Sequence, residues 1–93
     1  MVVGILHLEL HVPHAQSLKD RRSVVKSLKE QLRGKWNVAT AEVEAGEQWQ
    51  RASLGIVTVG DDREIVHSTL EQAVAWLRSH PTVELIQVEQ ELL

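Results

Sequence analysis

The sequence VVGILHLELHVPHAQSLKDRRSVVKSLKEQLRG, residues 2–34, decides the fold. From Val2 to Val12 every second side chain is apolar or glycine, the period of two expected for a strand with one buried face. Pro13 ends this strand, because proline cannot donate to a neighbouring strand. The face expected to be buried carries Gly4, Leu6, Leu8, Leu10 and Val12, and the other carries Ile5, His7, Glu9 and His11.

The second half of this stretch has the 3.6-residue period of an amphipathic helix. The helix is predicted from Leu18 to about Arg33, with Ser17 as its N-cap and Asp20 as the acidic partner in a capping box. Gly34 stands where a C′ glycine is expected. The apolar side of the helix carries Leu18, Val24, Val25, Leu28 and Leu32.

Further along, the pattern predicts strands over residues 37–44, 51–59 and 83–91, with one helix between the last two. Residues 45–50 are interpreted as a hairpin connection, Asp61 with Glu64 as the start of the second helix, and Pro81 as its limit. Either face of the third strand could be buried, because Ala52, Leu54 and Ile56 alternate with Ser53, Gly55, Val57 and Val59.

This β-α-β-β-α-β order predicts a single α+β domain, residues 1–93, with the ferredoxin-like fold. Right-handed crossovers give a four-stranded antiparallel sheet of strand order 4-1-3-2, with both helices on one face. There is no cysteine, and no run approaches the ~18 apolar residues of a membrane span. We therefore expect a cytoplasmic protein without a membrane partner.

The net charge of −3 is unevenly distributed along the chain. Residues 14–36 carry a net +5, so the remainder carries −8. Five cations of the first helix, spaced three, four, three and four residues apart, form what we call the basic row: Lys19, Arg22, Lys26, Lys29 and Arg33. The row falls within about 80° of the helix surface and extends about 21 Å. It could neutralise several phosphates, which predicts contact with RNA or the ribosome. A solvated helix face and an acidic protein partner are the alternatives.

Arg21 falls within the apolar arc of the same helix, where a charge needs a partner. We expect it to reach the rim of the core or to pair with Glu42 or Glu44.

His7, Glu9 and His11 share one face of the first strand. Successive residues on a strand face are about 6.5–7 Å apart, so one metal ion cannot bind both histidines. Glu9 with His11 would need a ligand from a neighbouring strand, and the sequence does not name one. We therefore predict no metal site and interpret the three as part of an open sheet face.

An open face that is half apolar and half polar is typical of a dimer or protein-docking interface. The predicted protein-interaction residues are His7, Glu9, His11, Trp49 and Arg51. A tryptophan in a loop is often a contact anchor, and packing against the sheet edge is the alternative for Trp49. A homodimer through the open face is the second hypothesis.

We predict no catalytic residues and no cofactor, because the chain has neither a glycine-rich phosphate loop nor a nucleophile in a recognisable setting. Base stacking on the sheet, as RRM domains do it, is not expected, because the chain contains no Phe and no Tyr.

The segment AQSLKDRRSVVKSL (residues 15–28), with VATAEV (38–43) and WQRA (49–52), resembles the YlxP-like family of uncharacterised bacterial proteins. The likeness extends from residue 3 to about residue 91. It implies a bacterial, cytoplasmic, ferredoxin-like domain with no assigned activity, cofactor or catalytic residue. Family members commonly lie near the genes of translation initiation factor 2 and ribosome-binding factor A. That neighbourhood implies a role close to ribosome assembly or translation.

Overall fold

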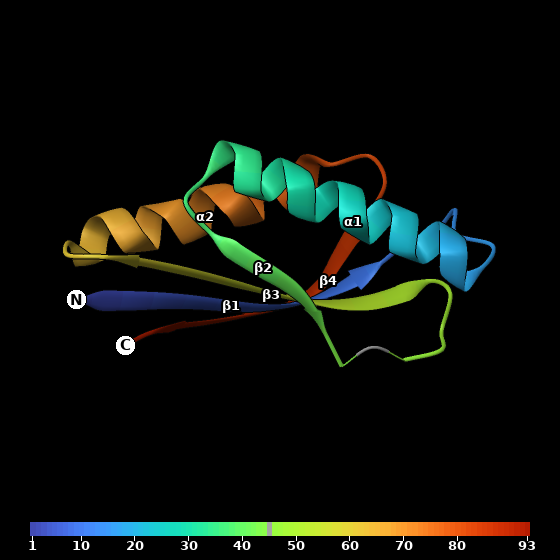
Figure 1. Ribbon diagram of the computed structural model, residues 1–93, viewed down its shortest axis with the longest axis horizontal. Coiled ribbons are helices and arrows are strands. Elements are labelled where there is room, and N and C mark those ends of the chain that lie inside the picture. The colour runs from blue at the N-terminus through green and yellow to red at the C-terminus, as the bar shows by residue number, and fades with distance from the viewer. Residues whose placement is uncertain (45) are drawn as a thin grey trace.

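The computed structural model describes residues 1–44 and 46–93, and its elements follow one another in the predicted order (Figure 1). The strands are β1 (Val2–His11), β2 (Ala39–Val43), β3 (Arg51–Gly60) and β4 (Glu84–Leu92), and the helices are α1 (Leu18–Lys35) and α2 (Arg63–Ser79). The predicted hairpin connection starts at Ala45, which lies outside the described residues. Neither described helix is both long and apolar enough to cross a membrane.

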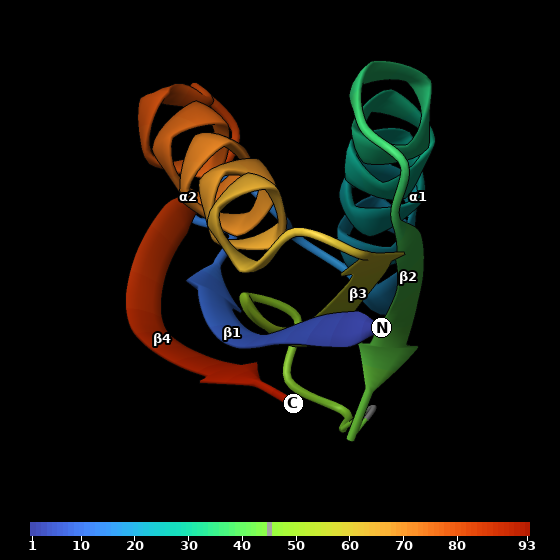
Figure 2. The same cartoon turned by 90° about the vertical axis from the view of Figure 1, so that its left-hand side faces the viewer.

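Neighbouring strands are antiparallel throughout, and the sheet order is β2-β3-β1-β4. This is the predicted order 4-1-3-2 counted from the opposite edge. Both helices cover the same face of the sheet, with α1 over β2 and β3 and α2 over β1 and β4 (Figure 2). The ferredoxin-like α+β prediction is confirmed, and none of the described elements covers the opposite face of the sheet.

The core between sheet and helices is aliphatic. Its fully buried side chains come from both helices and from the two central strands: Leu6, Leu8, Leu10, Leu28, Leu32, Leu54, Ile56, Leu70 and Leu77. The structure also decides the question left open for β3. Its Ala52, Leu54 and Ile56 are buried, so the alternate residues Gly55, Val57 and Val59 belong to the open face.

Helix α2 packs closely onto β1 at Gly4. A Cβ at this position would lie 2.7 Å from Val66 Cγ1 and 2.9 Å from Leu70 Cδ1, closer than carbon atoms approach without a shift. Glycine is therefore required here for the helix to reach the strand. At Gly34, by contrast, nothing lies within 4 Å of the position that a Cβ would take.

The predicted end of α1 is wrong by two residues. Gly34 is not a C′ residue, because the helix continues to Lys35 and its C-cap is Trp36, which has an extended φ of −136°. The Trp36 N–H still bonds to the Leu32 carbonyl at 3.0 Å, and the Trp36 ring packs edge-to-face on Trp76 with centroids 6.1 Å apart. These contacts hold the last turn in the helix beyond the glycine.

The two helix starts were predicted with different success. The Ser17 cap is confirmed, since its Oγ accepts from the Asp20 N–H at 3.0 Å. The cap of α2 is Asp62 and not Asp61, because Asp62 Oδ1 accepts from the N–H groups of Glu64 and Ile65 at 2.8 and 3.3 Å. An N-cap oxygen bonds the second and third helical N–H groups, and Asp62 stands at the matching distance in sequence.

Candidate functional site

The basic row lies along one flank of α1, as its spacing predicts. Lys19, Arg22, Lys26 and Arg33 are exposed and Lys29 is half-buried. Glu30 is one turn from Lys26, yet among residues 1–44 and 46–93 no carboxylate oxygen lies within 4.0 Å of a row nitrogen. The described acids therefore leave the five charges open to an outside anion.

The row borders the edge strand β2. Arg33 Nη1 donates to Thr40 Oγ1 of this strand at 3.4 Å. Among the residues that the structure describes, strand β2 pairs with β3 alone, so its other edge has no partner strand there. Helix α1 and strand β2 both lie at the right of Figure 2, and the Arg33–Thr40 contact places this end of the basic row on the side of β2.

Arg21 is buried on the same helix and binds the segment that leads into β3. It is 2% exposed, and its Nη1 donates to the carbonyls of Gly46, Gln48 and Arg51 at 2.9, 2.8 and 3.4 Å. Its Nη2 lies 3.2 Å from Glu42 Oε1, which confirms the predicted pairing with that residue. The two atoms form an ion pair without hydrogen-bond geometry, because Glu42 Oε1 accepts no hydrogen bond within the described residues.

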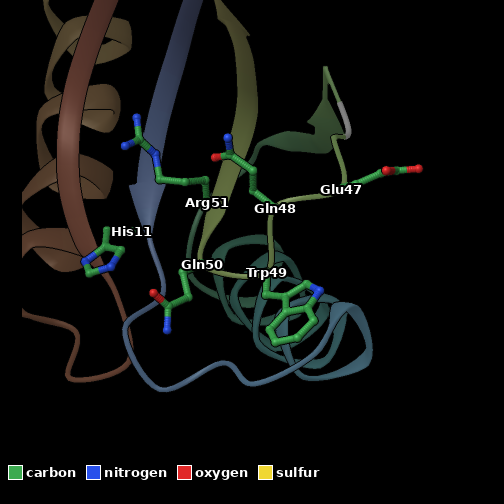
Figure 3. Close-up of a pocket in the computed structure, with 6 residues that line it drawn as sticks. All are labelled: His11, Glu47, Gln48, Trp49, Gln50 and Arg51. Atoms are coloured by element: carbon green, nitrogen blue, oxygen red, sulfur yellow. The ribbon is translucent and has the colours of Figure 1, made fainter.

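Trp49 lies on the segment that Arg21 binds, and it stays 54% exposed. Together with His11, Gln50 and Arg51 it lines a shallow hollow of about 520 Å³ (Figure 3). In this view Trp49 and His11 point to opposite sides of Gln50, whose Nε2 donates to the carbonyls of the loop after β1. The Trp49 ring is therefore exposed and is not buried against the sheet edge.

The open sheet face divides into an apolar half and a polar half. Val3 pairs with Val59 and Ile5 with Val57 across β1 and β3, and Val57 and Val59 are 38% and 51% exposed. On β1 the polar side chains of this face begin at His7, whereas on the edge strand β4 Glu91 already lies beside Ile5. Across the sheet, His7 lies beside Gly55 of β3 and then Ala41 of β2 on one side, and beside Glu89 of β4 on the other.

His7 and Glu9 meet a third residue in this polar half. Glu44, directly after β2, places its Oε1 3.9 Å from His7 Nε2, and Glu9 Oε1 lies 3.8 Å from the same nitrogen. His11 is separate from this cluster and faces Glu84 of β4 at 3.4 Å. The sequence did not point to Glu44, because its position depends on how β2 ends. The predicted strand order, in which only β3 separates β2 from β1, was the one signal that could have brought the end of β2 near His7.

Fold and surface together define a class: a small ferredoxin-like α+β domain with a basic helix flank on one side of the sheet and a half-apolar, half-acidic open face on the other. Residues 3–90 match the family described as "Protein of unknown function (DUF503)". The chain is also 31% identical over 83 residues to the protein named "Uncharacterized protein YlxP" of Bacillus subtilis (strain 168). This alignment covers 89% of the present chain and 90% of the relative. The chain belongs to this family of unknown function.

Proposed function

We propose that the protein is a non-enzymatic, cytoplasmic binding protein that contacts RNA, as exposed on a ribosomal subunit, through the basic row. The observation that carries the proposal is the set of five cations on one helix flank without a carboxylate within 4.0 Å among the described residues. The row extends along about 21 Å of a regular helix, so the backbone that carries its charges is already ordered before binding.

The charge of the other surfaces supports the same orientation. The polar half of the open sheet face includes Glu9, Glu44 and Glu89, which repel a polyanion. The remainder of the chain outside residues 14–36 is strongly acidic. A nucleic acid is therefore attracted to the α1 side and directed away from the sheet face.

Co-sedimentation with bacterial ribosomal subunits at low and moderate salt tests the proposal. We expect pelleting that weakens as salt rises, and binding to an RNA probe with a log–log salt slope of about −3.5 to −4.5 if five phosphates are contacted. The variant Lys26→Glu/Lys29→Glu should lose this binding while its thermal unfolding stays close to that of the parent.

A matched control separates the row from net charge. Arg63→Glu/Arg78→Glu changes the net charge by the same amount on α2, where both residues are exposed. We expect this variant to keep most of its binding. Equal loss in both variants would mean that only overall charge matters, and unchanged binding in Lys26→Glu/Lys29→Glu would remove the row from the proposal.

The apolar half of the open face supports a second candidate function, a homodimeric interaction module. Val57, Val59 and the neighbouring Ile5 form an apolar surface beside acidic residues, as in many protein interfaces. Sedimentation equilibrium of the parent and of Val57→Lys tests it. A dimer that Val57→Lys dissociates is expected, whereas a monomer at every accessible concentration would exclude self-association through this face.

A further inference from the structure

The cluster of His7, Glu9 and Glu44 has a shape that the strand pairings explain. His7 and Glu9 are same-face neighbours on β1, and β3 contributes Gly55 beside His7. Gly55 has no side chain of its own, and the position that its Cβ would take lies 3.5 Å from Val43 Cγ1 of β2, an ordinary contact distance. Glu44 leaves β2 with a left-handed φ of 52°. One ligand atom from each of the three residues lies within 4.8 Å of the others.

The ring nitrogen at the centre of this cluster lacks a partner. His7 Nε2 is shielded from solvent and makes no hydrogen bond within the described residues, since both carboxylate oxygens lie beyond 3.5 Å. A buried polar atom without a partner costs about 1–3 kcal/mol, and a bound ion or water is one of the ways in which folded proteins satisfy such an atom. The nitrogen faces two carboxylates, so a cation placed between the three groups would satisfy the ring nitrogen and both carboxylates at once.

One of the two carboxylates is already held in place. Ser53 Oγ donates to Glu9 Oε1, and Ser53 is buried on the strand next to β1. Hydrogen bonds of this kind orient the ligands of metal sites and raise their affinity. Glu44, whose side chain is 69% exposed, is free to adjust.

We propose that His7, Glu9 and Glu44 bind a divalent transition-metal ion, with zinc as the best match. Imidazole with carboxylates is a donor set for zinc, whereas magnesium and calcium take oxygen ligands. A tetrahedral zinc with bonds of about 2.0–2.1 Å holds its ligand atoms about 3.4 Å apart. The His7–carboxylate distances are 3.8 and 3.9 Å and all three ligand atoms lie within 4.8 Å of one another, so side-chain rotation, chiefly of the exposed Glu44, has to bring them closer for the ion to bind. Three protein ligands leave a fourth position for water or for an outside ligand.

The position of this site separates it from the basic row, because the cluster lies on the open sheet face and the row lies on α1 above the other face. Zinc binding is therefore independent of the RNA proposal, and either can fail alone.

Titration of the tag-free, chelator-treated 93-residue chain with zinc chloride in a calorimeter tests the site. We expect one ion per chain and a rise in the unfolding temperature with zinc, because the ion binds the folded state. His7→Gln and Glu44→Gln should each weaken zinc binding about tenfold or more, and Ser53→Ala by a smaller factor.

Two matched controls come from the same sheet face. His11→Gln removes a histidine that lies on the same face of β1 but contacts Glu84. Glu89→Gln removes a carboxylate of β4 that is the strand-pairing partner of His7 and lies outside the cluster. Both should bind zinc as the parent does. Absence of stoichiometric binding, or equal weakening by His7→Gln and His11→Gln, would overturn the proposal and leave His7 as an ion-pair partner of the two glutamates.

Discussion

Replacing the buried Arg21 with Met should be among the most destabilising substitutions of a charged residue in this chain. The guanidinium is 2% exposed and satisfies three carbonyls while pairing with Glu42, whose side chain is itself 18% exposed. Methionine fills a similar volume without a charge or a donor. Arg21→Met therefore isolates the polar role of the residue from its packing.

The expected magnitude follows from what the substitution leaves behind. Removing one partner of a buried ion pair costs about 3–5 kcal/mol, because the remaining charge is uncompensated. The carbonyls of Gly46 and Gln48 lie on exposed residues and can turn to water, so they add little to this figure. A domain of this size has about 5–15 kcal/mol of stability in total, so Arg21→Met should remove a large fraction of it.

Glu42→Gln is the informative partner variant. Here the buried Arg21 charge loses its counter-charge but keeps its three carbonyl acceptors, so the loss in unfolding free energy should be about 1.5–3 kcal/mol, below that of Arg21→Met. Urea unfolding followed by the fluorescence of the packed Trp36 and Trp76 measures both values. A loss below about 1 kcal/mol for Arg21→Met, or a larger loss for Glu42→Gln than for Arg21→Met, would refute the view that Arg21 anchors this segment.

Three further predictions test other parts of the structure. Gly4→Ala should lower the free energy of unfolding by about 1–3 kcal/mol, because its Cβ overpacks against α2. Gly34→Ala meets nothing within 4 Å among the described residues and should raise it by about 0.5–1 kcal/mol. Urea midpoints that shift in the same direction for both variants would contradict this. Asp62→Ala should cost about 1 kcal/mol and Asp61→Ala much less, because only Asp62 caps α2; thermal unfolding of the pair distinguishes them, and equal losses would argue against the assigned cap. Trp49→Phe should remove the fraction of tryptophan fluorescence that acrylamide quenches, with little change in stability, because this ring is 54% exposed; unchanged quenching would show that Trp49 is packed in solution.

Most of the fold could be predicted because its signals are local. The alternation in residues 2–12 and the helical period in residues 18–33 each lie within one element, and the order of elements then allows few topologies. Two errors have different causes: the cap of α2 falls on Asp62, the second of two adjacent aspartates, and the end of α1 is set by a tertiary contact. Packing of Trp36 on Trp76 extends α1 past Gly34, although glycine there favours an end.

A surface could be predicted from the sequence when its residues lie on a single helix or strand, and could not when it combines residues from several. The basic row is a property of a single helix, so its exposure followed from spacing alone. Which face of β3 is open depends on the packing of both helices, and the sequence left it undecided. The cluster around His7 depends on a residue from β2, a strand that reaches β1 only through β3. A ligand set that joins two residues of β1 to the residue after β2 has no signature in the spacing of either strand alone.

Arg21 connects the two surfaces to which we assign binding. It belongs to α1, between Lys19 and Arg22 of the basic row, and its guanidinium holds Glu42 two residues before Glu44. The same guanidinium fixes the carbonyls that follow Glu44 in the chain. The position of Glu44 over His7 and the packing of α1 beside β2 therefore depend on one buried side chain. A buried charge is an expensive way to gain stability alone, since an apolar residue of equal volume often serves as well. Its presence here is better explained by the directional contacts that only a guanidinium provides, because these hold a helix and a strand end in a defined position relative to each other.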